Sequence, residues 1–367
     1  MKSKYFLLLL VVILAALWLS ACSGAALVNS WPGLASDGET AYLAAGAHLY
    51  AIRLSDGREI WRYPVKSSNS IQFIAQPVLA PDGTLIIGSA GSDHRLVALD
   101  PSRLDPATNA PLEKWTFTDA KDRWIAGVLV LKDKVFAANT DGNVYVLDLT
   151  DGLANKKAIE QIELGGPLWS QPTSNGEVVF VTSMNHFLHA FDAQTYTSPW
   201  PAIDLGGAAP GSPLIGPDGS LYVGSFASQM VRVDPATGQV TPFASTQGWV
   251  WGGAALDGEI LYFGDLEGNF YAYQTNGQQV WSIQPDGPVV GSPLVTPNAI
   301  IFATESGSLY AVDRQGKIVW QREVGGKIYT TPIAGNEYIL TAPMQAKFAL
   351  SAHDLNGSMV WTYTPEK

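Results

Sequence analysis

Two histidines three residues apart, His186 and His189, have a type and spacing that could ligate a metal ion. On a helix this spacing places both imidazoles on one face, as a zinc site requires. The segment from Phe187 to Phe191 has the composition of a strand, however, and in a strand residues three apart point to opposite faces. We therefore expect two unrelated histidines and no metal site. The other histidines, which fall in separate parts of the chain, are His48, His94 and His353.

The motifs of the common enzyme classes are absent from the sequence. It contains no G-x-S-x-G elbow, no P-loop, no dinucleotide-binding glycine fingerprint and no Asp/Asn/Glu loop with calcium-ligand spacing. We therefore expect no catalytic residues and no enzyme activity. The formal net charge of −11, with no run of Lys or Arg, also argues against nucleic acid as a partner, because phosphate repels an acidic surface.

The N-terminal segment has the pattern of a bacterial export signal that ends in a cysteine. Lys2 and Lys4 form a basic start, residues 5–19 are an apolar run, and a small-residue site ends in Cys22. The apolar run is shorter than the roughly 18–20 residues that span a bilayer. The pattern resembles the lipobox of bacterial lipoproteins, which implies that Cys22 is lipidated and becomes the first mature residue. A plain secretory signal with an incidental cysteine is the alternative.

This pattern divides the chain into a signal peptide (1–21), a lipid-anchored tether (22–30) and a folded domain (31–367). A tether of about nine residues extends at most about 30 Å, so the folded domain is held close to the membrane. We expect the inner leaflet of the outer membrane if the source cell has one, and otherwise the outer face of the cytoplasmic membrane. Because Cys22 is the sole cysteine, no intrachain disulfide can form.

The folded domain consists of a repeated unit of four short strand-like runs. In the clearest unit these are residues 288–295, 299–303, 308–313 and 317–320, which are rich in β-branched or aromatic residues and separated by turn formers. The third run recurs in steps of 39 to 48 residues, starting at Tyr50, Val97, Tyr145, His189, Val231, Tyr271, Tyr310 and Ser351. This period is typical of propeller blades. The sequence therefore predicts an all-β fold, a single eight-bladed β-propeller of four-stranded antiparallel blades.

Most units carry a turn glycine and then a tryptophan after the third run. The tryptophans at this place are Trp61, Trp115, Trp200, Trp281, Trp320 and Trp361. The pattern resembles the tryptophan-docking repeat of the pyrroloquinoline-quinone (PQQ) type β-propellers, which implies that these rings pack between neighbouring blades. The last unit completes its own outer strand at residues 359–363, although residues 25–29 could still pair with that edge.

A proline also recurs in the first run of five units, at Pro77, Pro172, Pro213, Pro293 and Pro332. Proline cannot donate a ladder hydrogen bond, so within a sheet it belongs on an edge strand. We therefore expect the first run of each unit to be the inner edge of the blade, facing the central channel, and the tryptophan-bearing run to be the outer strand.

The lipobox, the tether and the propeller together resemble the outer-membrane assembly lipoproteins of the BamB family over residues 22–367. The resemblance implies a non-catalytic, monomeric scaffold that is anchored to the membrane by its lipid and binds envelope or membrane proteins, with a part in their assembly. A ligand- or glycan-binding sensor is an alternative. A PQQ-dependent quinoprotein is another, but those enzymes resemble one another in a calcium site and an adjacent-cysteine disulfide, for which this sequence lacks the residues. We expect no cofactor.

One set of residues could bind a partner. Three residues before the proline position of successive units stand Ile74, Trp124, Trp169, Pro210, Trp251, Val290 and Tyr329. Equivalent positions in a propeller form a ring, so we expect these side chains near one mouth of the channel. Large rings are typical interface anchors, which makes the following residues candidates for partner binding: Phe73, Trp124, Trp169, Trp249, Trp251 and Tyr329. The alternative is that these rings pack between blades, away from solvent.

Overall fold

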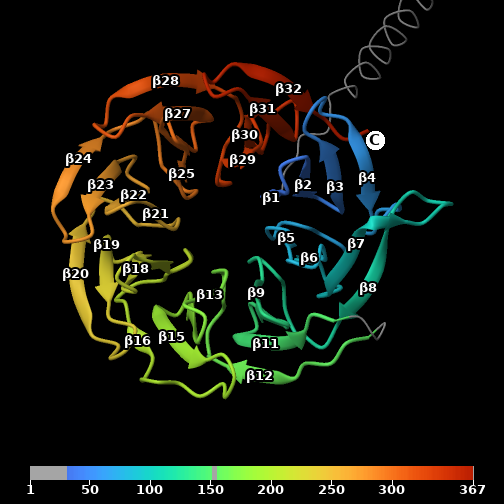
Figure 1. The fold of residues 1–367 in the computed structure, drawn as a ribbon, viewed down its shortest axis with the longest axis horizontal. Helices are drawn as coiled ribbons and strands as arrows, with labels where there is room; N and C mark the ends of the chain where they lie inside the picture. Colours follow the sequence, from blue (N-terminus) through green and yellow to red (C-terminus); the bar gives the residue numbers. More distant parts are fainter. Residues whose placement is uncertain (1–30, 151–154, 367) are drawn as a thin grey trace, which may run out of the picture.

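The computed structural model describes residues 31–150 and 155–366, which form eight blades around a central axis (Figure 1). Each blade is a sheet of four strands that pair antiparallel with their neighbours in the sequence. The described residues contain no helix, and therefore none long and apolar enough to cross a membrane. The predicted all-β, eight-bladed architecture is confirmed. The predicted signal peptide, the tether with Cys22 and the possible closing segment 25–29 lie outside the described residues.

The strands fall into four sets by their distance from the axis (Figure 1). The innermost strands, in blades 1 to 8, are β1 (Gly33–Ser36), β5 (Val78–Leu79), β9 (Leu129–Leu131), β13 (Thr173–Ser174), β17 (Leu214–Ile215), β21 (Ala255–Asp257), β25 (Leu294–Val295) and β29 (Ile333–Gly335). The second strands are β2 (Thr40–Ala45), β6 (Leu85–Gly88), β10 (Lys134–Ala138), β14 (Val178–Thr182), β18 (Leu221–Ser225), β22 (Ile260–Gly264), β26 (Ile300–Ala303) and β30 (Tyr338–Thr341).

The third strands are β3 (His48–Arg53), β7 (Leu96–Leu104), β11 (Asn143–Asp148), β15 (Phe187–Asp192), β19 (Gln229–Val233), β23 (Phe270–Gln274), β27 (Ser308–Val312) and β31 (Leu350–His353). The outer strands are β4 (Glu59–Tyr63), β8 (Pro111–Phe117), β12 (Glu160–Glu163), β16 (Ile203–Asp204), β20 (Val240–Ser245), β24 (Gln279–Ile283), β28 (Ile318–Glu323) and β32 (Met359–Tyr363). The first strand of each blade lies at the channel and the fourth at the rim, as predicted.

The innermost strands are shorter than the sequence pattern suggests. The apolar run 288–295 yields only the two-residue strand β25, because the five residues before Pro293 cross from the preceding blade without ladder partners. Each of the five recurrent prolines stands directly before an inner strand. At this place the sheet requires no N–H donor, so a proline breaks no ladder hydrogen bond. The inner edge of the blade therefore tolerates proline.

The hydrophobic core is divided into eight clusters, one at each interface between neighbouring blades. A blade has two apolar faces, and each face is buried against the next blade around the ring. The interface between the last and first blades is filled in the same way, for example by Leu340 and Ala352 of blade 8 against Leu34 and Leu43 of blade 1. Within the described residues, the ring closes by face-to-face packing.

Tryptophans in the outer strands, or in the case of Trp200 just before one, join five of the blades to the next. Five of them donate their indole N–H to a backbone carbonyl in the turn between the third and fourth strands of the following blade, namely Trp115 to Leu149, Trp200 to Pro235, Trp281 to Arg314, Trp320 to Leu355 and Trp361 to Leu54. The ring lies on a turn glycine of that blade, so that a Cβ on Gly357 would stand 2.8 Å from Trp320. Trp61, the sixth, is buried against Tyr42 and has no acceptor for its N–H among the described residues.

Candidate functional site

One mouth of the central channel opens into a cavity of about 410 Å³. The cavity is lined by the residues just before the inner strands. At these residues the chain reaches the channel after it crosses from the outer strand of one blade to the inner strand of the next. Side chains three positions before the proline place, or its register equivalent, form a ring that we call the collar: Trp31, Ile74, Ile125, Trp169, Pro210, Trp251, Val290 and Tyr329.

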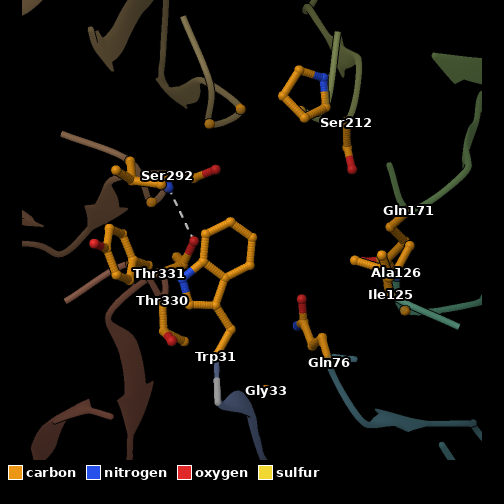
Figure 2. A pocket seen from close by; sticks show the side chains of 18 of the residues that line it. Trp31, Gly33, Gln76, Ile125, Ala126, Gln171, Ser212, Ser292, Thr330 and Thr331 are labelled. Atoms are coloured by element: carbon orange, nitrogen blue, oxygen red, sulfur yellow. Dashed lines mark hydrogen bonds between the residues drawn. The ribbon is translucent and has the colours of Figure 1, made fainter. Parts of the chain in front are cut away.

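A second ring is formed by the residues two positions after each collar residue in the sequence. We call it the polar ring. Its members are Gly33, Gln76, Gly127, Gln171, Ser212, Gly253, Ser292 and Thr331. Figure 2 shows the indole of Trp31 extending into the middle of the pocket, with Gln76, Gln171, Ser212 and Ser292 around it. All described side chains that line the cavity are uncharged. The site is therefore suited to a neutral group that has both apolar and hydrogen-bonding surface.

Aromatic rings from distant blades meet across this mouth. Trp31 of blade 1 contacts Trp251 of blade 6 edge to face, with ring centroids 5.5 Å apart, and Tyr329 of blade 8 at 5.4 Å. Trp251 also lies 6.2 Å from Trp169 of blade 4. These separations are within the range in which aromatic pairs attract one another. The rings form one continuous cluster.

The cluster extends outward to the most exposed tryptophan among the described residues. Trp249 is 50% exposed and stacks on Phe226, with centroids 4.6 Å apart and planes inclined by 13°. Phe226 in turn contacts Trp251 at 5.3 Å. A solvent-exposed aromatic surface is thus continuous with the rings inside the mouth.

Apart from Trp61, the indole N–H groups separate the described tryptophans into two classes. Trp115, Trp124, Trp200, Trp281, Trp320 and Trp361 donate to protein carbonyls. In contrast, no acceptor among the described residues binds the N–H of Trp31, Trp169, Trp249 or Trp251. Trp31, Trp169 and Trp251 are half-buried and Trp249 is exposed, so these four donors at one mouth are available to a ligand.

Ion pairing fixes one side of the collar. Glu305 accepts hydrogen bonds from the Lys327 ammonium (2.6 Å) and from the Tyr329 hydroxyl (2.9 Å). The hydrogen bond from Lys327 is the main reason that the pKa of Glu305 lies below its usual range. The Glu305 carboxylate therefore holds the Tyr329 ring in its place in the mouth at neutral pH.

A buried carboxylate fixes the loop that carries Trp249 and Trp251. Asp265 is fully buried and accepts hydrogen bonds from the Gly248 N–H (3.0 Å) and the Tyr271 hydroxyl (2.8 Å), among others. The Leu266 N–H donates to the Trp249 carbonyl at 3.0 Å. Hydrogen bonds to a buried carboxylate are strong, so the bond from Gly248 to Asp265 fixes the backbone next to Trp249.

Trp124 does not belong to the collar, which corrects the sequence-based assignment. Blade 3 lacks the inner proline, and the sequence pattern alone put its proline position at residue 127, three residues after Trp124. The strand register pairs Leu129 with Phe136 as it pairs Val78 with Ile86, so Ile125 takes the collar position. A shift of one residue turns the side chain to the other face. Trp124 is fully buried, and its N–H donates to the His94 carbonyl at 2.8 Å.

Phe73 is likewise withdrawn as a partner contact, because it is fully buried and packs at 6.4 Å from Tyr63. The structure places Trp169, Trp251 and Tyr329 in the collar and Trp249 beside it. Sequence reasoning missed Trp31 and Phe226. The signal for Trp31 was its place three residues before Leu34, the blade 1 equivalent of Pro77, whereas Phe226 lies in a loop between β18 and β19 that no repeat feature marks.

The histidines form no metal site among the described residues. His189 is buried, with Nε2 3.3 Å from the Ser183 hydroxyl, and burial lowers its pKa to about 4. His186 is instead half-exposed beside Asp204, at 3.2 Å. His186 lies in the turn before β15 (Phe187–Asp192), with a positive φ of 68°, whereas His189 lies within the strand, so the two imidazoles have different surroundings.

Comparison with models of known protein families identifies the family of this chain. A model of the family described as outer membrane protein assembly factor BamB matches residues 15–242 and 243–366. The chain belongs to this family. The BamB resemblance inferred from the sequence is thereby confirmed. No curated protein matched the chain.

Solved structures similar to this BamB family member share its fold. BamB from Moraxella catarrhalis is 18% identical, with a TM-score of 0.65 over 90% of this chain and 96% of that one. The computationally designed Ika8 protein is 11% identical, with a TM-score of 0.69 over 92% of this chain and 98% of that one. At these identities the likeness shows the propeller fold alone.

The channel of this BamB family member does not fit PQQ, the cofactor after which the repeat is named. PQQ is a polyanion, and the calcium ion that accompanies it in quinoproteins needs carboxylate and amide oxygens. The described lining offers neither a cation to pair with the quinone nor a carboxylate to hold the metal. Its tryptophans and neutral hydroxyl and amide groups suit a neutral ligand instead.

Proposed function

We propose that this protein is a non-catalytic, lipid-anchored scaffold on the extracytoplasmic side of a bacterial membrane, which binds other envelope proteins and assists their assembly. Membership of the BamB family supports this proposal, since the family is described as an outer membrane protein assembly factor. The eight filled blade interfaces support a monomeric propeller, because no apolar blade face is left for a second copy to cover.

The observation that carries the proposal is the aromatic cluster at the channel mouth. Trp31, Trp169, Trp249 and Trp251 offer rings and free indole N–H groups on one face of the propeller. Tryptophan is enriched among the residues that dominate binding energy at protein interfaces. Free N–H donors can pair with backbone carbonyls of an extended segment, whose own groups are unpaired until it folds. We infer that the mouth captures an extended segment of an envelope protein.

Site-specific photo-crosslinking in cells tests this function. A benzoylphenylalanine residue would replace Trp249, and a matched control would carry it at Val280, which is 45% exposed on the outer strand β24. We expect the probe at position 249 to form adducts with envelope proteins, and the attachment points to map to segments that are extended before assembly. Equal adduct yields at both positions, or none at position 249, would contradict the proposed mouth.

The lipid anchor is tested separately. Replacing Cys22 by Ser removes the thiol that would carry the lipid, and we expect the protein to move from the membrane fraction to the soluble extracytoplasmic fraction. A protein that stays in the membrane fraction with Cys22→Ser would contradict lipid anchoring at this residue, whatever the crosslinking shows.

The polar ring favours a second candidate function, the binding of a neutral small ligand such as a saccharide. The side chains of Gln76, Ser212 and Ser292 have no hydrogen-bond partner among the described residues, and they face the cavity. Titration calorimetry with neutral oligosaccharides would detect such a ligand. A heat of binding that is lost in Gln76→Ala and Ser292→Ala would favour this function over protein capture.

A further inference from the structure

Trp31 differs from the rest of the collar in how it is held. The backbone that follows it is fixed: the Pro32 carbonyl accepts a hydrogen bond from the Thr330 hydroxyl at 2.9 Å, and Gly33 lies so close to blade 2 that a Cβ there would stand 2.0 Å from the Ala75 carbonyl oxygen. Leu34, the next residue, is 2% exposed in the interface between blades 1 and 8. The attachment point of the Trp31 side chain is therefore rigid.

The Trp31 side chain contacts two other rings and makes no hydrogen bond within the described residues. Its indole extends to Trp251 and Tyr329, and its N–H has no acceptor among the described residues. Departure of this side chain by rotation about its own Cα–Cβ bond would break no hydrogen bond within the described structure. It would leave a space bounded by the rings of Trp251 and Tyr329, and Glu305 holds Tyr329 in position.

We propose that the mouth recognises one aromatic side chain of the partner segment, and that Trp31 occupies the place of that side chain in the free protein. This inference rests on the proposed function and specifies its ligand. An aromatic ring in this place would meet Trp251 edge to face, as Trp31 does. The uncharged lining selects against a charged side chain, because it offers no partner to offset desolvation of the charge.

Trp31 and Trp169 have the same residue type in the same ring, yet the proposal assigns them opposite roles. Trp31 competes with the partner for the space beside Trp251. Trp169 contacts Trp251 at 6.2 Å, has no ring contact with Trp31 among the described residues, and forms part of the wall. Truncation of Trp31 should therefore strengthen binding, whereas truncation of Trp169 should weaken it.

Fluorine NMR on the purified full chain measures both effects. The probe is an acetylated and amidated Gly/Ser peptide with one central 4-fluorophenylalanine. With Trp31→Ala we expect its affinity to rise about tenfold, as for a site that is open about one-tenth of the time. With Trp169→Ala we expect it to fall about three- to tenfold. An unlabelled phenylalanine peptide should compete with the probe, and its cyclohexylalanine analogue, equally apolar but without a π system, should compete much less.

The outcomes separate this inference from the proposed function. Weaker binding with both variants would show that Trp31 is part of the wall, which overturns the inference and leaves the proposed function standing. Equal competition by the cyclohexylalanine peptide would overturn the aromatic specificity. Affinity that is unchanged in both variants, or no binding to any form of the protein, would overturn the mouth as the capture site. Melting curves that match the parent protein establish that the variants are folded.

Discussion

Trp31 and Trp251 meet edge to face over the channel, with planes inclined by 89°, although they come from blades 1 and 6. They are far apart in the sequence, and only closure of the ring brings them together. Trp251 also contacts Trp169 and Phe226, which makes it the centre of the aromatic cluster. The capture surface is therefore a property of the whole ring, to which no single blade contributes more than a small part.

Truncation of the central ring tests the cluster. Trp251→Ala removes contacts to three other rings, so we expect partner capture to weaken by about 2 kcal/mol, the range of an interface hot spot. Trp169→Ala removes one ring contact and should cost less. Capture yields in the crosslinking assay give the order of the effects. Both side chains are only partly buried, so the melting curves should change little. Unchanged capture with an unchanged melting curve would contradict the role of these rings.

The neighbours Trp124 and Ile125 test the register of blade 3. Trp124→Ala removes a fully buried side chain that packs on Phe117 and Tyr145, so we expect a loss of about 3–5 kcal/mol in the free energy of unfolding. Ile125→Ala changes the collar and should alter peptide binding, with a much smaller loss of stability. Urea unfolding and peptide titration of both variants provide the measurements. A binding defect in Trp124→Ala with full stability would show that the collar assignment is wrong.

Repetition explains how much of this fold could be predicted. Each blade must bury two apolar faces, so the same pattern recurs in every unit. The period could be predicted from the recurrence of the third run, and the strand order from recurrent prolines such as Pro293. The collar was predicted only in part, because its membership depends on register, and blade 3 has no proline to mark it. The contact of Trp31 with Trp251 depends on distances across the ring, which the sequence of neither blade contains. Phe226 lies in the loop between β18 and β19, outside the repeated strand pattern, and stacks on Trp249 from the next blade.

The contact between Trp320 and Gly357 tests how blades are joined. Gly357→Ala places a Cβ 2.8 Å from the Trp320 ring and forces a side chain into a positive φ of 80°. The matched control is Gly38→Ala, where φ is also positive but no atom lies within 4 Å of the new Cβ. The control should cost about 1–2 kcal/mol for backbone strain alone. We expect a clearly larger loss for Gly357→Ala in urea unfolding. Equal losses would mean that the tryptophan moves aside freely.

Burial of His189 predicts a dependence of stability on pH. Its pKa falls from 6.5 to about 4 on folding because burial disfavours the charged imidazolium. Between these values the unfolded chain binds a proton that the folded chain does not, so the free energy of unfolding falls as the pH falls from about 6.5 toward 4. By about pH 7.5, one unit above the unfolded pKa, both states are largely neutral at this residue, and its contribution levels off. At pH 4.5 the expected loss is about 2–3 kcal/mol relative to pH 7.5.

Other groups titrate in the same range, so the loss must be measured against a variant without the imidazole. His189→Gln keeps a polar side chain near the Ser183 hydroxyl and removes the titration. Urea unfolding at pH 7.5 and 4.5 gives one difference for each protein, and the parent protein should lose about 2–3 kcal/mol more than the variant on acidification. Lowered carboxyl pKa values, such as that of Glu305, act on both proteins alike and cancel in the comparison. An equal loss in parent and variant would mean that His189 takes up its proton without unfolding, and that its burial carries no stability penalty in acid.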